Sequence, residues 1–293
     1  MKRLFLPVLL ATLLVAGCKP AAKQTDPEAA TNLTFAVRGV IQQIPEGARR
    51  VSIKHEKIPG YMAAMTMDFT LKNTNALAGL KTGDEITFTL VVAGDDDWIE
   101  NLQRTGRTEQ VIPRANPNAG QELSVGDTLP DYEFTSETGK VVKFSDFRGR
   151  AVAFTFFFTS CPLPEYCPRM NKNLAEARQL LLADKAGPTN WQFLSISFDY
   201  MVDEPKILAN YAGIYRGTNA DRWLFAVASS STLAGLAPKV DLNFWRENGT
   251  ITHNLRTVVV DGAGKITRQF DGNEWTAQQL AEAIRAAAEL KMP

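Results

Sequence analysis

Residues 151–168 read Ala-Val-Ala-Phe-Thr-Phe-Phe-Phe-Thr-Ser-Cys-Pro-Leu-Pro-Glu-Tyr-Cys-Pro. The apolar run at 151–158, with phenylalanine at four positions, predicts a strand that is buried on both faces of a sheet. A loop bounded by Cys161 and Cys167 follows at once, and apolar residues at helical spacing begin after it. The stretch therefore predicts a buried strand, a short loop between two cysteines, and a helix over 168–183.

Strands and helices alternate in the rest of the C-terminal part. We expect strands at 193–198, 257–260 and 265–270, and helices at 204–215 and 276–289. Pro205 lies in the first turn of one of these helices, where its fixed φ angle is already helical. Central strands that alternate with helices predict an α/β domain with helices on both faces of the sheet.

The N-terminal part contains short alternating runs instead. They lie at 35–41, 50–55, 65–71, 85–92 and 98–103. Five short strands within about 70 residues predict a small, closed β-barrel of the OB type. Residues 105–122 contain two prolines, two glycines and no apolar periodicity, so we interpret them as a linker between the two domains.

The first 18 residues predict an export signal. Two basic residues, Lys2 and Arg3, precede an apolar run that ends at Cys18. A membrane-spanning helix needs about 20 apolar residues, and this run is shorter. Its end, Val-Ala-Gly-Cys, resembles the bacterial lipobox, in which the cysteine is lipidated and becomes the new N-terminus. The alternatives are an ordinary signal peptide and a short uncleaved anchor.

These patterns divide the chain into five segments. We expect a lipoprotein signal peptide at 1–18, a tether at 19–32, a β-barrel at 33–104, a linker at 105–122 and an α/β domain at 123–293. The polar tether is typical of a flexible connection. The lipobox-like end implies an exported protein that faces the periplasm and is held at the membrane by a lipid.

Composition excludes several classes of protein. The 32 Lys and Arg residues equal the 32 Asp and Glu residues, so nothing indicates the basic surface of a nucleic-acid-binding protein. The hydrophobic fraction of 45% is ordinary for a globular protein. With Cys18 lipidated, only Cys161 and Cys167 remain for a disulfide, which excludes a small disulfide-rich scaffold.

Four residues of the N-terminal part carry donor atoms that suit copper. Met65 and Met67 are two residues apart on a predicted strand, so their side chains point to the same face. Met62 lies just upstream, and His55 ends the preceding strand. Thioether and imidazole groups bind Cu(I), and thioethers discriminate against zinc. Methionine also fills gaps in hydrophobic cores, so core packing is the alternative.

The segment 55–69 and the Leu-Lys-Thr-Gly-Asp motif at 80–84 are similar to small periplasmic copper- and silver-binding barrels related to the metallochaperone of the Cus efflux system. The similarity covers residues 35–105. The ligands that it implies are His55, Met65 and Met67. In the best-known members a tryptophan caps the metal at the position of Met62. The methionine here removes that cation–π cap and implies an added thioether.

The other cysteines and histidine form a second candidate group. Cys167 begins the predicted helix, where unpaired N–H groups and the positive end of the helix dipole lower the pKa of a thiol. Such a thiolate is a nucleophile or a metal ligand. The alternatives are two buried, inert cysteines and, at His253, a structural histidine. A thioredoxin-like reductase has a cis-proline near His253, whereas this chain has no proline between Pro238 and Pro293, which favours a metal-facing histidine.

The C-terminal part resembles the SCO/SenC family, thioredoxin-like proteins of copper delivery to cytochrome oxidase. The resemblance lies in the Phe-rich strand with two Cys-Pro steps, in Asp199 and Asp203 after a later strand, and in a histidine ahead of a late strand. It covers residues 120–290 and implies a supporting role for Asp203. The copper ligands that it implies are Cys161, Cys167 and His253. The family usually has three residues between the cysteines, whereas this chain has five, at 162–166.

Together the two resemblances imply a membrane-anchored chaperone that passes copper, as Cu(I) or Cu(II), to the copper-receiving subunit of a cytochrome oxidase. Such a protein performs no chemistry on a substrate and is not an enzyme. One alternative is a thiol–disulfide reductase that uses Cys161 and Cys167 to keep the oxidase's copper-ligand cysteines reduced. Another is a periplasmic copper-resistance or copper-sensing protein in which the barrel is the main binder.

Overall fold

The computed structural model describes residues 32–44, 49–94, 96–111, 122–247 and 250–290, and two large sheets lie in these ranges. The predicted lipidation site at Cys18 and most of the predicted linker lie outside the described residues. From Asn32 onward the chain forms one unit by its contacts. None of the helices in the described ranges is long and apolar enough to cross a membrane.

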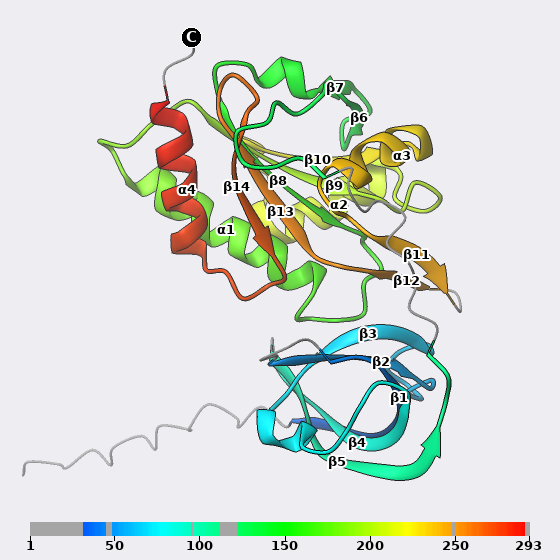
Figure 1. Ribbon diagram of the computed structural model, residues 1–293. Helices are drawn as coiled ribbons and strands as arrows, with labels where there is room; N and C mark the ends of the chain where they lie inside the picture. Colours follow the sequence, from blue (N-terminus) through cyan, green and yellow to red (C-terminus); the bar gives the residue numbers. More distant parts are fainter. Residues whose placement is uncertain (1–31, 45–48, 95, 112–121, 248–249, 291–293) are drawn as a thin grey trace, which may run out of the picture. The chain divides into compact units, whose positions relative to one another are not determined.

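The first sheet is built from the alternating runs of the N-terminal part. Its strands follow the hydrogen-bonded order β3, β2, β1, β4, β5 and are all antiparallel (Figure 1). Their bounds are β1 Leu33–Gln43, β2 Arg50–His55, β3 Met65–Thr70, β4 Asp84–Ala93 and β5 Asp96–Thr108. The five expected strands are confirmed. Strand β5 continues to Thr108, into the stretch expected to be a linker.

The two edge strands of this sheet meet at one point. Leu71, just after β3, forms an isolated parallel bridge with Ile99 of β5, and the Lys72 amide donates a hydrogen bond to the Ile99 carbonyl at 3.1 Å. The expected closed barrel is therefore an OB-like sheet whose seam is a single bridge in place of a full ladder. Each strand contributes a fully buried residue to the interior: Ile41, Ile53, Phe69, Leu90 and Ile99.

The second sheet has the strand order β14, β13, β8, β9, β10, β6, β7. The bounds are β6 Glu133–Ser136, β7 Val141–Lys143, β8 Ala151–Phe157, β9 Trp191–Ser197, β10 Trp223–Ala228, β13 Arg256–Val260 and β14 Ile266–Asp271. The central strands β8, β9 and β10 are parallel, and the outer strands pair antiparallel. Every residue of β8 and β9 is buried, as the apolar runs predict for strands covered on both faces.

Four α-helices and two short 3-10 helices accompany the sheets. Their bounds are α1 Cys167–Ala183, α2 Pro205–Arg216, α3 Ser230–Lys239, α4 Ala277–Glu289, η1 Thr74–Leu77 and η2 Phe144–Phe147. Helix α1 packs against α4, and both contact β8, whereas α2 contacts β10 (Figure 1). This is the α/β domain that the alternating pattern predicts, with the thioredoxin-like fold that the resemblance implies. Helices α1, α2 and α4 are confirmed, while α3, β6, β7 and β10 were not among the expected elements.

A separate two-stranded hairpin follows α3. It consists of β11 Phe244–Glu247 and β12 Thr250–His253, paired antiparallel. His253 is the last residue of β12 and lies just before β13, which starts at Arg256. The hairpin thus carries His253 out of the main sheet and toward the loop that follows β8.

Candidate metal centre

Three predicted ligands from distant parts of the chain converge. Cys161 lies in the loop after β8, Cys167 is the first residue of α1, and His253 ends β12. Their ligand atoms all lie within 4.8 Å of one another, and Cys167 Sγ is 3.7 Å from His253 Nε2. The structure therefore brings the three side chains into one cluster with the composition of a Cys2His site.

The imidazole of His253 is oriented by its backbone and by aromatic rings. Its Nδ1 lies 2.8 Å from the carbonyl oxygen of Asn254, which accepts a hydrogen bond, so Nδ1 donates a proton there and Nε2 is the nitrogen that faces the thiols. The rings of Phe158, Phe198 and Tyr166 meet the imidazole edge to face, with centroid distances of 5.7, 4.9 and 6.0 Å. These contacts hold Nε2 toward the two thiols.

The two thiols differ in acidity, and not in the way that the sequence predicts. Burial opposes ionisation of Cys161, but hydrogen bonds from Cys167 and His253 and the nearby imidazole charge outweigh it and lower the pKa of Cys161 to about 5. Burial, the bond with Cys161 and the Cys161 charge raise the pKa of Cys167 well above that of an ordinary thiol. The expectation of a lowered pKa at the helix N-terminus is wrong for Cys167, because its side chain is completely buried.

Asp203 supports the loop without touching the thiols. Its buried carboxylate accepts hydrogen bonds from the Thr159 amide at 3.0 Å, from the Thr159 hydroxyl and from the Ser197 hydroxyl. It therefore fixes the backbone two residues before Cys161. Its negative charge also contributes to the raised pKa of Cys167.

A salt bridge ties the hairpin to the same region. Arg246 of β11 donates to the buried carboxylate of Asp199 at an N–O distance of 2.5 Å. Asp199 lies two residues after the end of β9. Because His253 pairs with Phe244 across the hairpin, this bridge also restrains His253.

Sequence reasoning missed three residues around Cys167. The Asn171 side chain donates to the Cys167 carbonyl at 3.1 Å, and its own oxygen accepts from Ser195 at 2.8 Å. The Tyr211 ring stacks on Phe157 with a centroid distance of 5.1 Å, within the range of about 4.5–7 Å for aromatic pairs. Tyr166 immediately precedes Cys167, and its place in the longer loop was the one available signal.

The four predicted ligands of the barrel are all buried. His55 is directly opposite Met65 in the β2–β3 ladder, and Met67 lies one inward-facing position further along β3. Residues directly opposite in a ladder have Cβ atoms about 4.5–5.5 Å apart. Met62 is also buried and forms a backbone bridge with Ile58. The exposed fractions of the four side chains are between 2% and 5%.

The local backbone gives His55 the same tautomer as His253. Its Nδ1 lies 2.7 Å from the carbonyl oxygen of Glu56, so Nε2 carries the lone pair. Gly39 faces His55 across the β1–β2 ladder, and a Cβ atom at Gly39 would lie 2.5 Å from the Ile53 side chain. Glycine therefore lets β1 approach the strand that positions His55.

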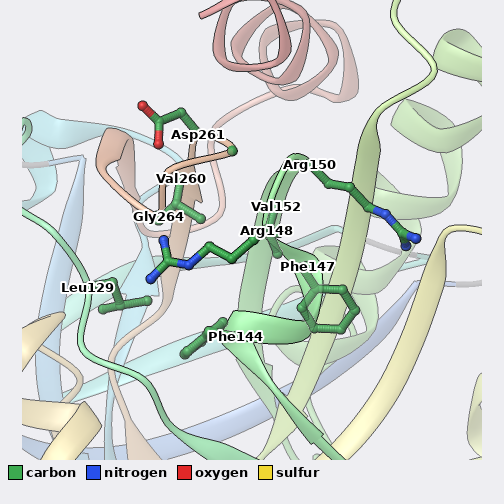
Figure 2. Close-up of a pocket in the computed structure, with 10 residues that line it drawn as sticks. Leu129, Phe144, Phe147, Arg148, Arg150, Val152, Val260, Asp261 and Gly264 are labelled. Carbon is green, nitrogen blue, oxygen red and sulfur yellow. The ribbon is translucent and has the colours of Figure 1, made fainter. Parts of the chain in front are cut away.

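Both clusters suit a soft metal. Two thiols with an imidazole, and three thioethers with an imidazole, are donor sets that favour Cu(I), and in both histidines Nδ1 is held by a backbone carbonyl, which leaves Nε2 for the metal. A pocket elsewhere in the α/β domain is lined by residues such as Phe144, Arg148 and Asp261, and none of the candidate ligands lines it (Figure 2). The chemistry-bearing residues therefore lie in the two clusters and not in this pocket.

Two family models match the chain. The model described as "Copper binding periplasmic protein CusF" matches residues 34–104. The model described as SCO1/SenC matches residues 120–289, which is more than half of the chain. No curated protein matches the chain.

Solved structures resemble the C-terminal part. A SCO1/SenC family lipoprotein from Bacillus anthracis is 23% identical, with a TM-score of 0.50 over 56% of this chain and 96% of that chain. Yeast Sco1 with copper bound is 17% identical, with a TM-score of 0.48 over 58% and 92%. Arabidopsis thaliana ScoI with copper bound is 15% identical, with a TM-score of 0.47 over 56% and 98%. The first likeness shows the fold of this part.

Proposed function

Because the chain belongs to the SCO1/SenC family, we propose that it is a copper chaperone whose cargo binds Cys161, Cys167 and His253. The observation that carries the proposal is the convergence of these ligand atoms within 4.8 Å of one another. Copper would leave by exchange between soft ligands, with no chemistry on a substrate. Its receiver would be the copper-binding subunit of a cytochrome oxidase.

We propose that the barrel is a second copper site, with His55, Met65 and Met67 as ligands and Met62 as an added thioether. The match of residues 34–104 to the CusF model supports this proposal. The same proposal includes a linker at 105–122 that separates the barrel from the α/β domain, so that each domain binds copper. A copper-resistance or copper-sensing protein would use the same barrel as its main binder.

A thiol–disulfide reductase is the second candidate function. The lowered pKa of Cys161 favours it, because a thiolate is the attacking species in disulfide exchange. Cys161 and Cys167 serve both functions, whereas His253 as a ligand serves only copper delivery. His253 therefore separates the two candidates.

We expect His253→Ala to impair oxidase maturation in cells grown at limiting copper. Loss of a ligand should weaken copper binding by at least the 10–100-fold that loss of a supporting partner costs, while the dithiol can still be oxidised and reduced. Oxidase activity in cells that carry His253→Ala or Cys161→Ser is the measurement, with Tyr132→Phe, far from the thiols, as a folded control. Full activity with His253→Ala and none with Cys161→Ser would favour the reductase.

We also propose that the mature chain begins at a lipidated Cys18 and faces the periplasm. The apolar run that ends in Val-Ala-Gly-Cys motivates the proposal. Mass spectrometry of protein extracted from membranes should show a diacylglyceryl adduct on Cys18. A product that lacks the adduct, whether or not residues 1–18 are retained, would contradict it.

A further inference from the structure

We propose that the loop at 162–166, with the first turn of α1, is a docking element for this chain's own barrel, and that it holds the barrel's copper site beside the Cys161–Cys167–His253 site for direct transfer of Cu(I). The inference rests on the proposed function, which supplies the two sites. It adds a partner for the loop and a route for the metal.

Tyr166 joins the two sites through one side chain. Its hydroxyl donates to the Asp68 carbonyl at 2.7 Å and accepts from the Asp68 amide at 3.1 Å. Asp68 follows Met67 on β3. The ring of Tyr166 meets the imidazole of His253 at 6.0 Å. The residue before Cys167 thus binds the backbone next to one candidate ligand and packs on another.

Arg50 of β2 completes the contact around Tyr166. Its guanidinium lies 5.5 Å from the centre of the Tyr166 ring and donates to the Tyr166 hydroxyl at 3.3 Å. It also donates to the side chain of Asn273, which in turn donates to the Glu165 carbonyl. These bonds form a closed set between the barrel, the loop and the segment after β14.

The first turn of α1 supplies a second link. Arg169 donates to Asp96 of β5 at 3.1 Å and to Glu165 in the loop before α1. Asp97, beside Asp96, is only 5% exposed, and burial raises its pKa to about 6 although Arg50 and Arg169 lower it. Arg50 from β2 of the barrel and Arg169 from α1 both attract this buried carboxylate, so the positive charge of α1 complements the negative charge of β5.

Burial of the loop itself also indicates that the barrel contacts it. Tyr166 and Glu165 are each 5% exposed, and Asn273 is 4% exposed. Polar side chains in a connecting loop normally lie in water. Here Tyr166 bonds to Asp68 of β3 and to Arg50 of β2, and Asn273 bonds to Arg50, so strands of the barrel contact both residues. The five-residue loop carries both the tyrosine and the glutamate that make these contacts.

The docked arrangement places the two metal sites next to each other. Strand β3, which carries Met65 and Met67, and strand β12, which ends at His253, approach within 8 Å between Cα atoms. The phenol of Tyr61, the neighbour of Met62, lies within electrostatic range of Cys161. The backbone that carries Met65 and Met67 therefore lies next to the backbone that carries His253, and Tyr61 lies near Cys161.

The transfer step is a ligand exchange without electron transfer. Bonds from Cu(I) to the thioether sulfurs and to His55 break, and bonds to Cys161, Cys167 and His253 form. Cys161 attacks as a thiolate, and Cys167 releases its proton to water when it binds. Copper stays Cu(I) throughout, so no oxidant or reductant takes part in the step.

The test measures transfer in the whole mature chain. A Cys161–Cys167 disulfide blocks one site while the barrel is loaded with one equivalent of Cu(I). Reduction of the disulfide then starts transfer, which the near-ultraviolet charge-transfer absorption of Cu(I)–thiolate reports, with the rate of reduction measured separately. Tyr166→Phe removes the hydroxyl that binds Asp68 and keeps the ring, and Arg50→Ala removes the second contact.

Matched controls are Tyr132→Phe, which loses a hydroxyl bonded to the Gly235 carbonyl, and Arg38→Ala, which loses an exposed charge on β1. We expect wild type and controls to transfer at a rate that is independent of protein concentration. Tyr166→Phe and Arg50→Ala should be at least about tenfold slower and should speed up with concentration, as a bimolecular step does. Unchanged, concentration-independent transfer in both variants would overturn the inference.

Amide hydrogen exchange of the metal-free chain separates the inference from the proposed function. Docking predicts that the amide of Asp68 and the amides of Leu163, Glu165 and Tyr166 are protected in wild type and lose protection together in Tyr166→Phe. If wild type shows this pattern but binds no copper at one of the two sites, the proposed function and the transfer are wrong. Docking would still be established by the exchange data. Equal exchange in wild type and Tyr166→Phe would overturn docking while both copper sites stand.

Discussion

Oxidation of Cys161 and Cys167 to a disulfide should remove one of the two copper-binding sites entirely. Copper ligation by cysteine requires free thiolates, and a disulfide offers none. The barrel uses thioethers and imidazole, which mild thiol oxidants leave unchanged. We therefore expect the reduced chain to bind two equivalents of Cu(I) and the oxidised chain to bind one, measured by competition with a chromophoric Cu(I) chelator.

The double variant Cys161→Ser, Cys167→Ser is the matched control for this experiment. It should bind one equivalent whether or not oxidant is present, because it has no dithiol to close. His253→Ala should keep the dithiol and bind copper more weakly at the Cys161–Cys167 site. An oxidised wild-type chain that still binds two equivalents would place the second copper outside the Cys161–Cys167–His253 cluster.

The double variant Met65→Leu, Met67→Leu should lose Cu(I) from the barrel. Leucine has nearly the volume of methionine, so the substitution removes two sulfur atoms and leaves the packing almost unchanged, at a cost below about 1.5 kcal/mol per site. Measured on the oxidised chain, copper binding should fall from one equivalent to none. Thermal unfolding of the metal-free variant reports whether the barrel is still folded.

Two further variants distinguish copper binding from core packing. Met65→Ala, Met67→Ala should also lose copper, but with about 2–5 kcal/mol of destabilisation per buried methionine from the cavities left behind. Met201→Leu replaces a methionine that is 68% exposed and should change neither copper binding nor stability. If Met65→Leu, Met67→Leu binds Cu(I) as tightly as wild type, the two methionines are core residues and not ligands.

Local patterns were enough to predict most of the fold. The apolar run at 151–158 and the alternation at 65–71 each span only a few residues. A strand buried on both faces has a continuous apolar run, and a strand buried on one face alternates apolar and polar residues, so both were predictable. The resemblance to the SCO/SenC family added the prediction that His253 and the two cysteines, far apart in the sequence, bind one metal. Strand β10 and helix α3 escaped prediction, although the apolar run at 223–228 and the N-cap Ser229 were local signals for them.

The sequence by itself determined which donor atoms the protein has and on which elements they lie. The sequence contains two histidines, the paired cysteines and the closely spaced methionines. Their thiol, thioether and imidazole groups are ligands that suit copper. Strand periodicity placed Met65 and Met67 on one face, and the helix start placed Cys167 at an N-terminus. These conclusions need only neighbours in the chain.

Only the tertiary structure decided which thiol ionises and what the loop between the cysteines contacts. Cys167 meets His253 from 86 positions away, and Tyr166 meets Asp68 from 98 positions away. A pKa is the balance between loss of water and the charges and hydrogen bonds that replace it, and packing sets both. That is why Cys161, and not the helix-terminal Cys167, has the lowered pKa.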